Sequence, residues 1–231
     1  ASWRTMQWQR WPTAGPVGCF AGADDYDAAV EDLIRSGVIK DPGMVYYDLR
    51  PSEHQRTLEL RICDACPRAD TVVLITGLFR ALVEDARAGL ERPGAGCDGR
   101  HEWLRAAVWR AAQSGLEGTL VDPVTRAATP APDVVRAMVH RLRPTLEAYG
   151  DWDTVHALTE EALARGSAAH RLREVADQEG MLACVRAAVA ETRGEYGPGT
   201  GTGAVRRPVT GAGGSGPAGT SAAYSVESVG G

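Results

Sequence analysis

The sequence predicts an α+β fold, in which a short antiparallel sheet precedes a largely helical carboxy-terminal half. Residues 44–51 and 56–64 alternate apolar and polar side chains with a period of two, which is typical of strands. Beyond Asp64, apolar residues recur at spacings of three and four, which indicates helices that pack on helices. With 231 residues and 44% apolar content, the chain is long enough to bury a hydrophobic core.

The amino-terminal part is expected to hold one helix and a hairpin. Residues 1–20 are rich in Trp, Pro and Gly, which favours an ordered, packed loop over a helix. A helix is then expected from about residue 25 to 36, capped by Asp24 or Asp25 and followed by Gly37. Its apolar positions share one face and are Tyr26, Val30, Leu33 and Ile34. The two strand segments follow, joined by the polar turn SEHQ, so we expect a hairpin.

The second half is predicted to be helical up to a glycine-rich end. Residues 68–90 are apolar on most sides, including Val72 and Val73, as expected of a buried helix. Further helices are expected near residues 100–114, 131–149, 151–165, 167–176 and 178–192. Residues 194–231 have little apolar bulk to offset chain entropy, so we expect a disordered tail after a domain of residues 1–193.

Composition excludes several classes of protein. A net charge of -5 argues against a nucleic-acid-binding surface, which needs clustered basic residues. No apolar run reaches the roughly 18 residues of a membrane span, and no secretion signal follows Ala1, so we expect a cytoplasmic protein without a membrane partner. The five scattered cysteines are expected to be reduced thiols. Cys63 and Cys66 lack a standard second pair, which disfavours a zinc site.

The polar face of the hairpin is the first candidate site. Alternation places Asp48, Arg50, Glu59 and Arg61 on one surface, within reach of one another across the strands. One interpretation is a solvated face of ion pairs, which would add little stability. The other is a site whose carboxylates hold Mg²⁺ while its arginines bind phosphate or a substrate carboxylate. The pattern leaves both interpretations open.

A second candidate site lies at residues 164–174, ARGSAAHRLRE. Ser167 can cap a helix whose first backbone N–H groups would face an anion, and Arg171 follows one turn later. The alternative is an ordinary capped surface helix.

Five blocks of the sequence resemble one family of enzymes. They are WQRWPTAGP (8–16), YYDLRPS (46–52), TLELRICD (57–64), WRAAQSGLEGTLVDP (109–123) and ARGSAAHRLR (164–173). In this order they resemble the carboxylate-amine ligases of the type 2 glutamate-cysteine ligase family, over about residues 2–192. The resemblance makes residues 1–193 part of a ligase catalytic domain, and we expect a further segment to precede Ala1.

The resemblance implies a fold and a reaction. The fold is expected to be related to glutamine synthetase, with part of an antiparallel sheet curved around a Mg²⁺-ATP and amino-acid site. In the reaction, ATP phosphorylates the side-chain carboxylate of glutamate, and the amine of cysteine, or another amine, displaces phosphate to form a γ-glutamyl amide. An acyl phosphate splits one hard step into two easier ones. The alternative function is a non-catalytic or incomplete ligase fragment that acts as a helical interaction module.

The resemblance also assigns site residues by their positions in the matching blocks. Glu59 is the expected Mg²⁺ ligand, and Arg50 and Arg61 are the expected catalytic contacts to a substrate carboxylate or phosphate. The residues expected to bind substrate or nucleotide are Arg10, Arg110, Arg171 and Arg173. The expected partners are small molecules, and the sequence leaves the formation of a homo-oligomer open.

Overall fold

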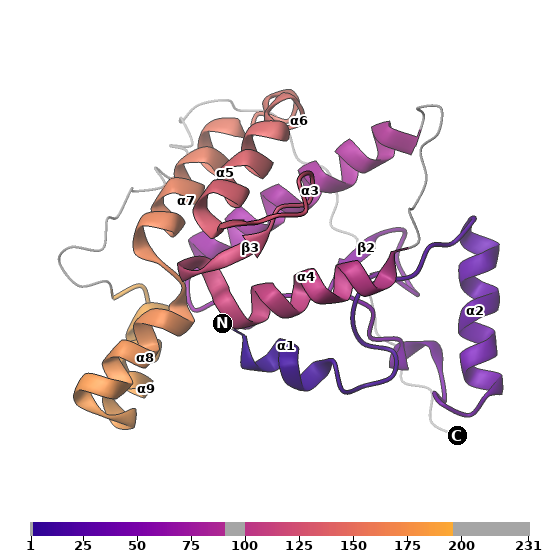
Figure 1. The fold of residues 1–231 in the computed structure, drawn as a ribbon, viewed down its shortest axis with the longest axis horizontal. Helices are drawn as coiled ribbons and strands as arrows, with labels where there is room; N and C mark the ends of the chain where they lie inside the picture. Colours follow the sequence, from indigo (N-terminus) through magenta and orange to yellow (C-terminus); the bar gives the residue numbers. More distant parts are fainter. Residues whose placement is uncertain (1, 91–99, 196–231) are drawn as a thin grey trace, which may run out of the picture. The chain divides into compact units, whose positions relative to one another are not determined.

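The structure of this chain is a computed structural model that describes residues 2–90 and 100–195 (Figure 1). The tail predicted over residues 194–231 lies outside the described residues beyond Glu195. The helices are α1 Trp3–Trp8, α2 Ala23–Arg35, α3 Ala69–Leu90, α4 His101–Ser114, α5 Ala131–Arg141, α6 Arg143–Ala148, α7 Trp152–Arg165, α8 Ala168–Glu179 and α9 Met181–Thr192. The strands are β1 Leu49–Pro51, β2 Leu58–Leu60, β3 Thr119–Val121 and β4 Ala128–Pro130.

The predicted fold class is confirmed, since antiparallel strands precede a largely helical second half. β1 pairs with β2 and β3 pairs with β4, each as a separate antiparallel sheet of two strands. The described residues therefore contain two hairpins and no larger sheet. Two 3₁₀ turns, Pro42–Met44 and Gly115–Glu117, complete the regular structure.

The amino terminus is helical where a loop was predicted. The Ser2 hydroxyl accepts a hydrogen bond from the backbone N–H of Thr5, which caps α1. The backbone N–H of Ser2 also donates to the carbonyl of Ala112 in α4, at 2.8 Å. The prediction of a loop over residues 3–8 is wrong because a six-residue helix is stabilised here by its cap and by a tertiary contact with α4.

The predicted helix near residues 25–36 is confirmed as α2, with a different start. Its N-cap is Gly22, so neither Asp24 nor Asp25 caps it. Asp25 instead accepts a hydrogen bond from the backbone N–H of Ala21 at 2.9 Å. Gly37 adopts a φ of 75° just after the helix, a conformation that favours glycine. The apolar face of α2 packs in a small core that contains Val30, Ile39 and Val45, with Tyr26, Leu33, Ile34, Met44 and Tyr47 around it.

The predicted hairpin is confirmed, although its strands are shorter than the alternation indicated. Leu49 pairs with Leu60, and Arg50 pairs with Glu59. The ladder continues as separate hydrogen bonds, in which the N–H of Arg61 donates to the carbonyl of Asp48 at 2.9 Å. Asp48 N–H donates in turn to the carbonyl of Gly15 at 2.8 Å, so the loop before α2 lies along the hairpin.

The larger core lies among α3, α5, α6 and α7. Its buried residues are Leu74, Ala81, Val139, Leu142, Leu146, Val155 and Leu158. α3 faces this core with a single stripe, because Val72 and Val73 are 48% and 50% exposed. The prediction that this helix is buried on most sides is therefore wrong.

Two further elements depart from the predicted helices. The segment predicted as one helix over residues 131–149 is divided into α5 and α6, because Pro144 in the first turn of α6 cannot donate a backbone hydrogen bond. The hairpin of β3 and β4 was not predicted. Its turn is held by Asp122, whose carboxylate accepts hydrogen bonds from the N–H groups of Val124 and Thr125 at 2.9 and 2.6 Å.

Two further observations concern the helices and the cysteines of the described residues. None of the described helices combines the length and the apolar character that a membrane span needs. Cys63, Cys66 and Cys184 are free thiols, as predicted. Cys19 is disulfide-bonded, so the prediction of reduced thiols is wrong for that residue, and Cys97 lies outside the described residues.

A glycine in the middle of α3 allows this helix to approach α7 closely. A Cβ atom at Gly77 would lie 2.7 Å from Cγ2 of Val155, and the buried Val155 side chain is only 2% exposed. The other glycine in α3, Gly89, has no heavy atom within 4 Å of the position of a Cβ. The two glycines therefore form a matched pair, one packed against a helix and one open.

We expect Gly77→Ala to destabilise the fold and Gly89→Ala to stabilise it. Alanine in an exposed helix gains up to about 1 kcal/mol over glycine, whereas overpacking a core costs about 1–3 kcal/mol. Urea unfolding followed by circular dichroism would measure both changes. Val155→Ala should relieve the clash, so the double variant Gly77→Ala, Val155→Ala should lose less stability than the sum of the single changes. Equal stability of the Gly77→Ala and Gly89→Ala variants would contradict this packing.

Candidate functional site

The polar face of the first hairpin contains the three residues that the sequence placed at the catalytic centre. Arg50 and Glu59 lie directly opposite each other, and Nε of Arg50 donates to Oε2 of Glu59 at 2.9 Å. Nη1 of Arg61 donates to the same oxygen at 3.4 Å. The carboxylate is thus held between two guanidinium groups, and the predicted juxtaposition of Arg50, Glu59 and Arg61 is confirmed.

Most of the Arg50 donors are engaged within the chain. Nη1 donates to the carbonyl of Val45 at 2.8 Å and lies near those of Pro42 and Gly43, at 3.4 and 3.3 Å. The side chain is 15% exposed. Only Nη2 makes no hydrogen bond to a residue that the structure describes, so this nitrogen is the donor that Arg50 can offer to a ligand.

Arg61 is less completely engaged than Arg50. Its guanidinium lies over the ring of Tyr46, 5.7 Å from the ring centroid, which is a cation–π distance. Its Nε atom is buried and has no hydrogen-bond partner among the described residues. A buried donor without a partner is costly, and a ligand oxygen would satisfy it.

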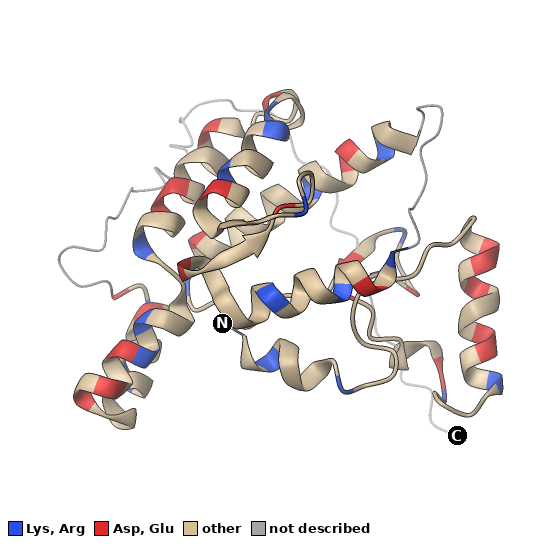
Figure 2. Cartoon of the chain, viewed as in Figure 1, with Lys and Arg blue, Asp and Glu red and all other residues tan. Residues whose placement is uncertain are grey.

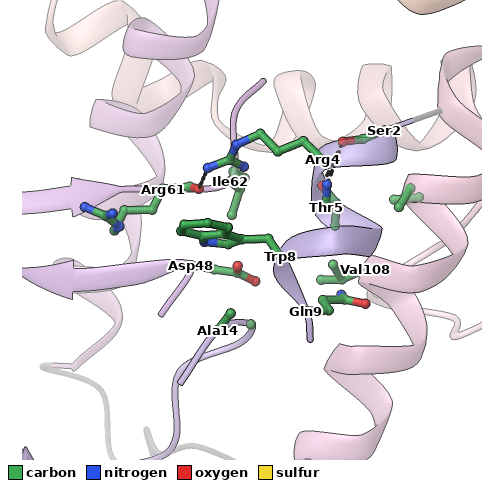
Figure 3. Close-up of a pocket in the computed structure, with 13 residues that line it drawn as sticks. Ser2, Arg4, Thr5, Trp8, Gln9, Ala14, Asp48, Arg61, Ile62 and Val108 are labelled. Carbon is green, nitrogen blue, oxygen red and sulfur yellow. Dashed lines mark hydrogen bonds between the residues drawn. The ribbon is translucent and has the colours of Figure 1, made fainter. Parts of the chain in front are cut away.

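A cavity of about 250 Å³ opens beside this face (Figure 3). It is lined by the end of the hairpin, by α1, by the loop at Ala14 and Gly15 and by α4. Arg4 reaches over the cavity from α1 and donates through Nη2 to the carbonyl of Arg61 at 3.3 Å (Figure 3). Asp48 lines the same cavity, so the fourth member of the predicted polar face lies beside the other three.

The pKa values of the two carboxylates in this region are shifted in opposite directions. Hydrogen bonding from Arg50, with the nearby charge of Arg61, lowers the pKa of Glu59 below its usual value. Burial raises the pKa of Asp48, and the charge of Arg4 opposes that change in part. Glu59 is therefore a paired anion, whereas Asp48 is a half-buried carboxyl group whose charge is poorly compensated.

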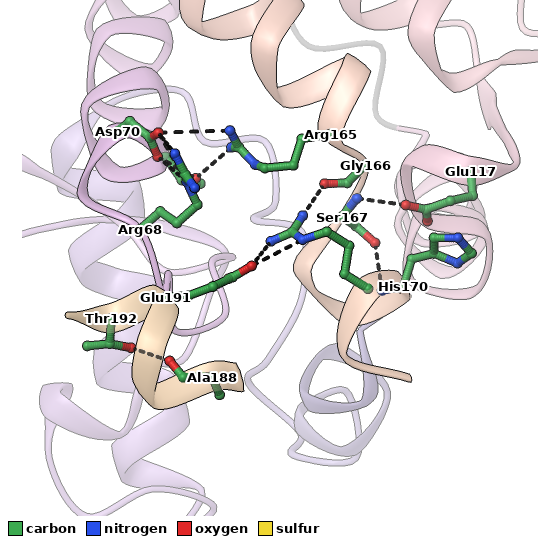
Figure 4. Close-up of polar contacts among 12 residues, drawn as sticks. Arg68, Asp70, Glu117, Arg165, Gly166, Ser167, His170, Ala188, Glu191 and Thr192 are labelled. Carbon is green, nitrogen blue, oxygen red and sulfur yellow. Dashed lines mark hydrogen bonds and ion pairs between the residues drawn. The ribbon is translucent and has the colours of Figure 1, made fainter. Parts of the chain in front are cut away.

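The second candidate site is an ion-pair cluster that joins α3, α7, α8 and α9 (Figure 4). Nη2 of Arg171 donates to Oε1 of Glu191 at 2.6 Å, and its Nη1 donates to the carbonyl of Gly166 at 2.7 Å. Ser167 is the N-cap of α8, as predicted, but its own N–H already donates to Oε1 of Glu117 at 2.7 Å. This arrangement agrees better with an ordinary capped helix than with an anion site.

Sequence reasoning missed the buried part of this cluster. Arg68 is 4% exposed and donates to Asp70 at 2.6 Å, and Nη1 of Arg165 lies 3.8 Å from the same carboxylate. Burial, together with the charge of Arg68, lowers the pKa of Arg165. The charged pair in PRAD, just before an apolar helix, was the available signal, because Asp70 falls in the first turn of α3.

The remaining predicted residues are not brought together. Arg10 is exposed and, within the described part of the chain, its side chain donates only to Gln7, at 3.4 Å. Arg110 in α4 and the exposed Arg173 in α8 make no ion pair with a described residue. Figure 2 shows basic residues spread over many helices rather than gathered on one. The structure therefore leaves the predicted nucleotide contacts at Arg10, Arg110 and Arg173 as predictions.

Comparison with known proteins identifies the family of this chain. The sequence model of the glutamate-cysteine ligase family 2 matches residues 1–191, which include both candidate sites. The chain belongs to this family.

The curated relatives of this ligase-family chain are longer than it is. A protein of Frankia casuarinae named "Putative glutamate--cysteine ligase 2-2" is 54% identical over 194 residues, which are 84% of this chain and 22% of that protein. A protein of Mycolicibacterium smegmatis with the same name is 51% identical over 193 residues, which are 83% of this chain and 49% of that protein. The chain thus spans between about a fifth and a half of these relatives.

The Mg²⁺ ion expected of a family member has few candidate ligands among the residues that the structure describes. No group of three or more His, Cys, Asp or Glu side chains in the described residues could hold a metal ion. Mg²⁺ is usually held by one or two carboxylates together with waters and substrate phosphates. Glu59 fits as one such carboxylate, but its charge is already offset by Arg50 and Arg61. The described residues do not form a magnesium site by themselves.

The lowered pKa of Glu59 predicts how stability changes in acid. Because the folded pKa lies below the unfolded value of about 4.3, ionised Glu59 stabilises the fold above that pH. This stabilisation is lost as the pH falls through the folded pKa. Glu59→Gln should therefore make the unfolding free energy less sensitive to pH below about 5, as measured by urea unfolding at a series of pH values. Glu53→Gln, in the exposed turn, should leave the wild-type slope, and identical slopes for both variants would contradict the pairing.

Proposed function

We propose that this chain is part of an ATP-dependent carboxylate-amine ligase of the cytoplasm that resembles a glutamate-cysteine ligase. The match of residues 1–191 to the family carries the proposal. The Arg50, Glu59 and Arg61 cluster supports it, because guanidinium groups can stabilise the charge of a phosphoryl group and of a carboxylate. The proposal concerns the whole protein, of which this chain covers a part.

The proposed reaction has two steps. A side-chain carboxylate oxygen of glutamate attacks the γ-phosphorus of ATP, and the bond to the β,γ-bridging oxygen breaks to release ADP. The amine nitrogen of cysteine, or of another amine, then attacks the carbonyl carbon of the acyl phosphate. The carbon–oxygen bond breaks, inorganic phosphate leaves and the nitrogen loses a proton, which forms the amide. Mg²⁺ would offset the charge of the phosphates in the first step.

The chain's own residues would bind and orient the reacting groups. Arg61 is the proposed contact to a phosphate or substrate carboxylate, through the Nε donor that has no partner among the described residues. Arg50 would contribute through Nη2 while its other donors hold Glu59 and the turn before β1. Glu59 would serve as a single carboxylate ligand of Mg²⁺ beside a bound nucleotide.

The other predicted arginines are candidates for binding the nucleotide. Arg10, Arg110 and Arg173 are candidates for the ATP phosphates, because no carboxylate among the described residues pairs with them. Arg171 is a weaker candidate, since Glu191 and Gly166 already accept from its guanidinium.

We expect the full-length protein to release ADP and phosphate only when ATP, glutamate and an amine acceptor are all present. Arg61→Gln should lower that rate by about 10²-fold or more, the loss seen when one stabilising donor is removed from a transition state. Arg56→Gln, in the exposed turn of the hairpin, is the control and should keep the wild-type rate. A coupled ADP assay measures both variants. An unchanged rate for Arg61→Gln would show the site assignment to be wrong, and ADP release without glutamate would refute the ligase function.

A non-catalytic interaction module is the second candidate function. It is favoured by an exposed apolar stripe on α9, where Met181, Leu182, Val185 and Val189 are 70%, 64%, 53% and 44% exposed. α9 packs against α8 and leaves this stripe open to another protein surface. Titration calorimetry of the full-length protein with Mg²⁺-ATP separates the two candidates, because a module without catalysis should give no binding heat.

A further inference from the structure

The backbone of Arg61 is held at both of its polar groups. Its N–H donates to the carbonyl of Asp48 at 2.9 Å, and its carbonyl accepts from Nη2 of Arg4 at 3.3 Å. The first contact continues the pairing of the hairpin, and the second comes from α1. Two separate elements therefore fix the backbone of Arg61, and only the dihedral angles of its side chain remain to be set.

Hydrogen bonds hold the Arg61 side chain weakly. Within the described residues, its ion pair joins Nη1 to Oε2 of Glu59 at 3.4 Å, whereas Arg50 reaches the same oxygen at 2.9 Å. The Arg61 Nε atom is buried and has no hydrogen-bond partner in the described part of the chain. A long ion pair adds little to the ordering of a side chain that has many rotamers. The orientation of the guanidinium therefore depends on a further contact.

That contact is the ring of Tyr46. The guanidinium carbon of Arg61 lies 5.7 Å from the centroid of this ring, within the range of about 6 Å for a cation–π interaction. Tyr46 belongs to the segment before β1, so it approaches Arg61 from outside the strand that carries it. A planar guanidinium stacks on an aromatic face, whereas an ion pair with one oxygen leaves it free to turn. The ring thus restricts the directions in which the Arg61 donors point.

The amino-terminal segment holds the Tyr46 ring in place. Trp8 of α1 and Trp11 contact it, with ring centroids 5.0 and 6.0 Å away and interplanar angles of 57° and 45°. Tilted aromatic pairs of this kind are favourable. The backbone N–H of Tyr46 donates to Oγ1 of Thr13 at 3.3 Å, and Thr13 is only 3% exposed. Tyr46 therefore has the fixed position that a residue needs in order to orient another.

Core packing does not account for this aromatic group. Trp11 is 48% exposed, and neither core found in the described residues includes any of the three rings. The neighbouring Tyr47 differs, because it packs against the core that contains Val30, and its ring lies 6.5 Å from that of Tyr26. Successive side chains of an extended segment point in opposite directions. One tyrosine thus supports a core, and the other supports Arg61.

We propose that Tyr46 is a positioning residue, whose ring holds the Arg61 guanidinium in the orientation that meets a phosphate or a substrate carboxylate. The inference rests on the proposed function, because Tyr46 acts on the reaction only through Arg61. A displacement of about 1 Å in a reacting group can cost 10²-fold in rate, so the direction of a single guanidinium matters. The ring, and not the tyrosine hydroxyl, performs this role.

Site-resolved chemical modification of the full-length protein tests the positioning. Phenylglyoxal reacts with guanidinium groups, and peptide mass spectrometry gives the rate at each arginine. Tyr46→Leu removes the ring, so Arg61 should react about threefold faster or more, whereas Tyr46→Phe keeps the ring and should leave the rate at the wild-type value. Arg50, with 15% of its side chain exposed, reports whether the hairpin stays folded, and the exposed Arg56 is the internal standard. Neither rate should change.

Glutamate-dependent ADP release measures the consequence for the reaction. Tyr46→Leu should lower kcat/KM about tenfold, and Tyr46→Phe should restore it to within about twofold of the wild type. Added to Arg61→Gln, Tyr46→Leu should cause no further loss, because the ring acts through that guanidinium alone. Tyr47→Leu is the matched control, since it removes the neighbouring ring that packs on a core. It should leave the Arg61 modification rate unchanged.

An isosteric replacement covers the case in which Tyr46→Leu unfolds the hairpin, which a faster reaction of Arg50 would reveal. Pentafluorophenylalanine at position 46 keeps the shape of the ring but withdraws negative charge from its face, so packing stays and the attraction for a cation is lost. Arg61 should then react faster while Arg50 does not. An unchanged Arg61 rate in this variant would overturn the proposal, as would a further loss of activity when Tyr46→Leu is added to Arg61→Gln.

Failure of this inference differs from failure of the proposed function. If the full-length protein never releases ADP, the modification rates still decide whether Tyr46 holds Arg61, and the ligase reaction alone is refuted. If ADP release depends on Arg61 but not on Tyr46, the ligase activity stands and the positioning role is refuted.

Discussion

The side chain of Arg50 joins the two strands of the first hairpin to the segment before it. Across the hairpin it pairs with Glu59 at 2.9 Å, and along the chain it donates to the carbonyl of Val45 at 2.8 Å. Val45 is 1% exposed and belongs to the core formed with Val30 of α2 and Ile39. Because each strand has only three residues, the backbone ladder is short and the Arg50 side chain contributes much of the specificity of the pairing. Arg50 therefore connects the pairing of the hairpin to the segment that packs against α2.

The same constraint shapes the candidate site. Arg50 and Arg61 share the Glu59 carboxylate, and Nε of Arg61 is buried without a hydrogen-bond partner among the described residues. The backbone of Asp48, which bonds to Arg61 on one side and Gly15 on the other, places its carboxyl group in the adjoining cavity. The ion-paired face and the cavity thus lie next to each other along the first hairpin.

Sequence reasoning succeeded where the signal was local and failed where distant residues decided. Periodicity located α2, α3 and the first hairpin, because an apolar stripe must face a core wherever the chain folds. It missed α1, which is too short to form without Ser2 and the contact with Ala112 in α4. Pro144 carried a local signal for the break between α5 and α6, and that signal was overlooked. Residues 164–174 gave the right cap at Ser167 but no sign that Glu117 would occupy its N–H group.

The sequence by itself determined the α+β class, the shared face of Arg50, Glu59 and Arg61, and the family. Alternation and ordered blocks are properties of neighbouring residues, so they need no knowledge of packing. Only the tertiary structure decided which charges are satisfied. It paired Arg171 with Glu191, some 20 residues away, and left the Asp48 carboxylate without a hydrogen bond to any described residue. Such pairings depend on how separate helices and strands approach one another, and no spacing along the chain specifies that distance.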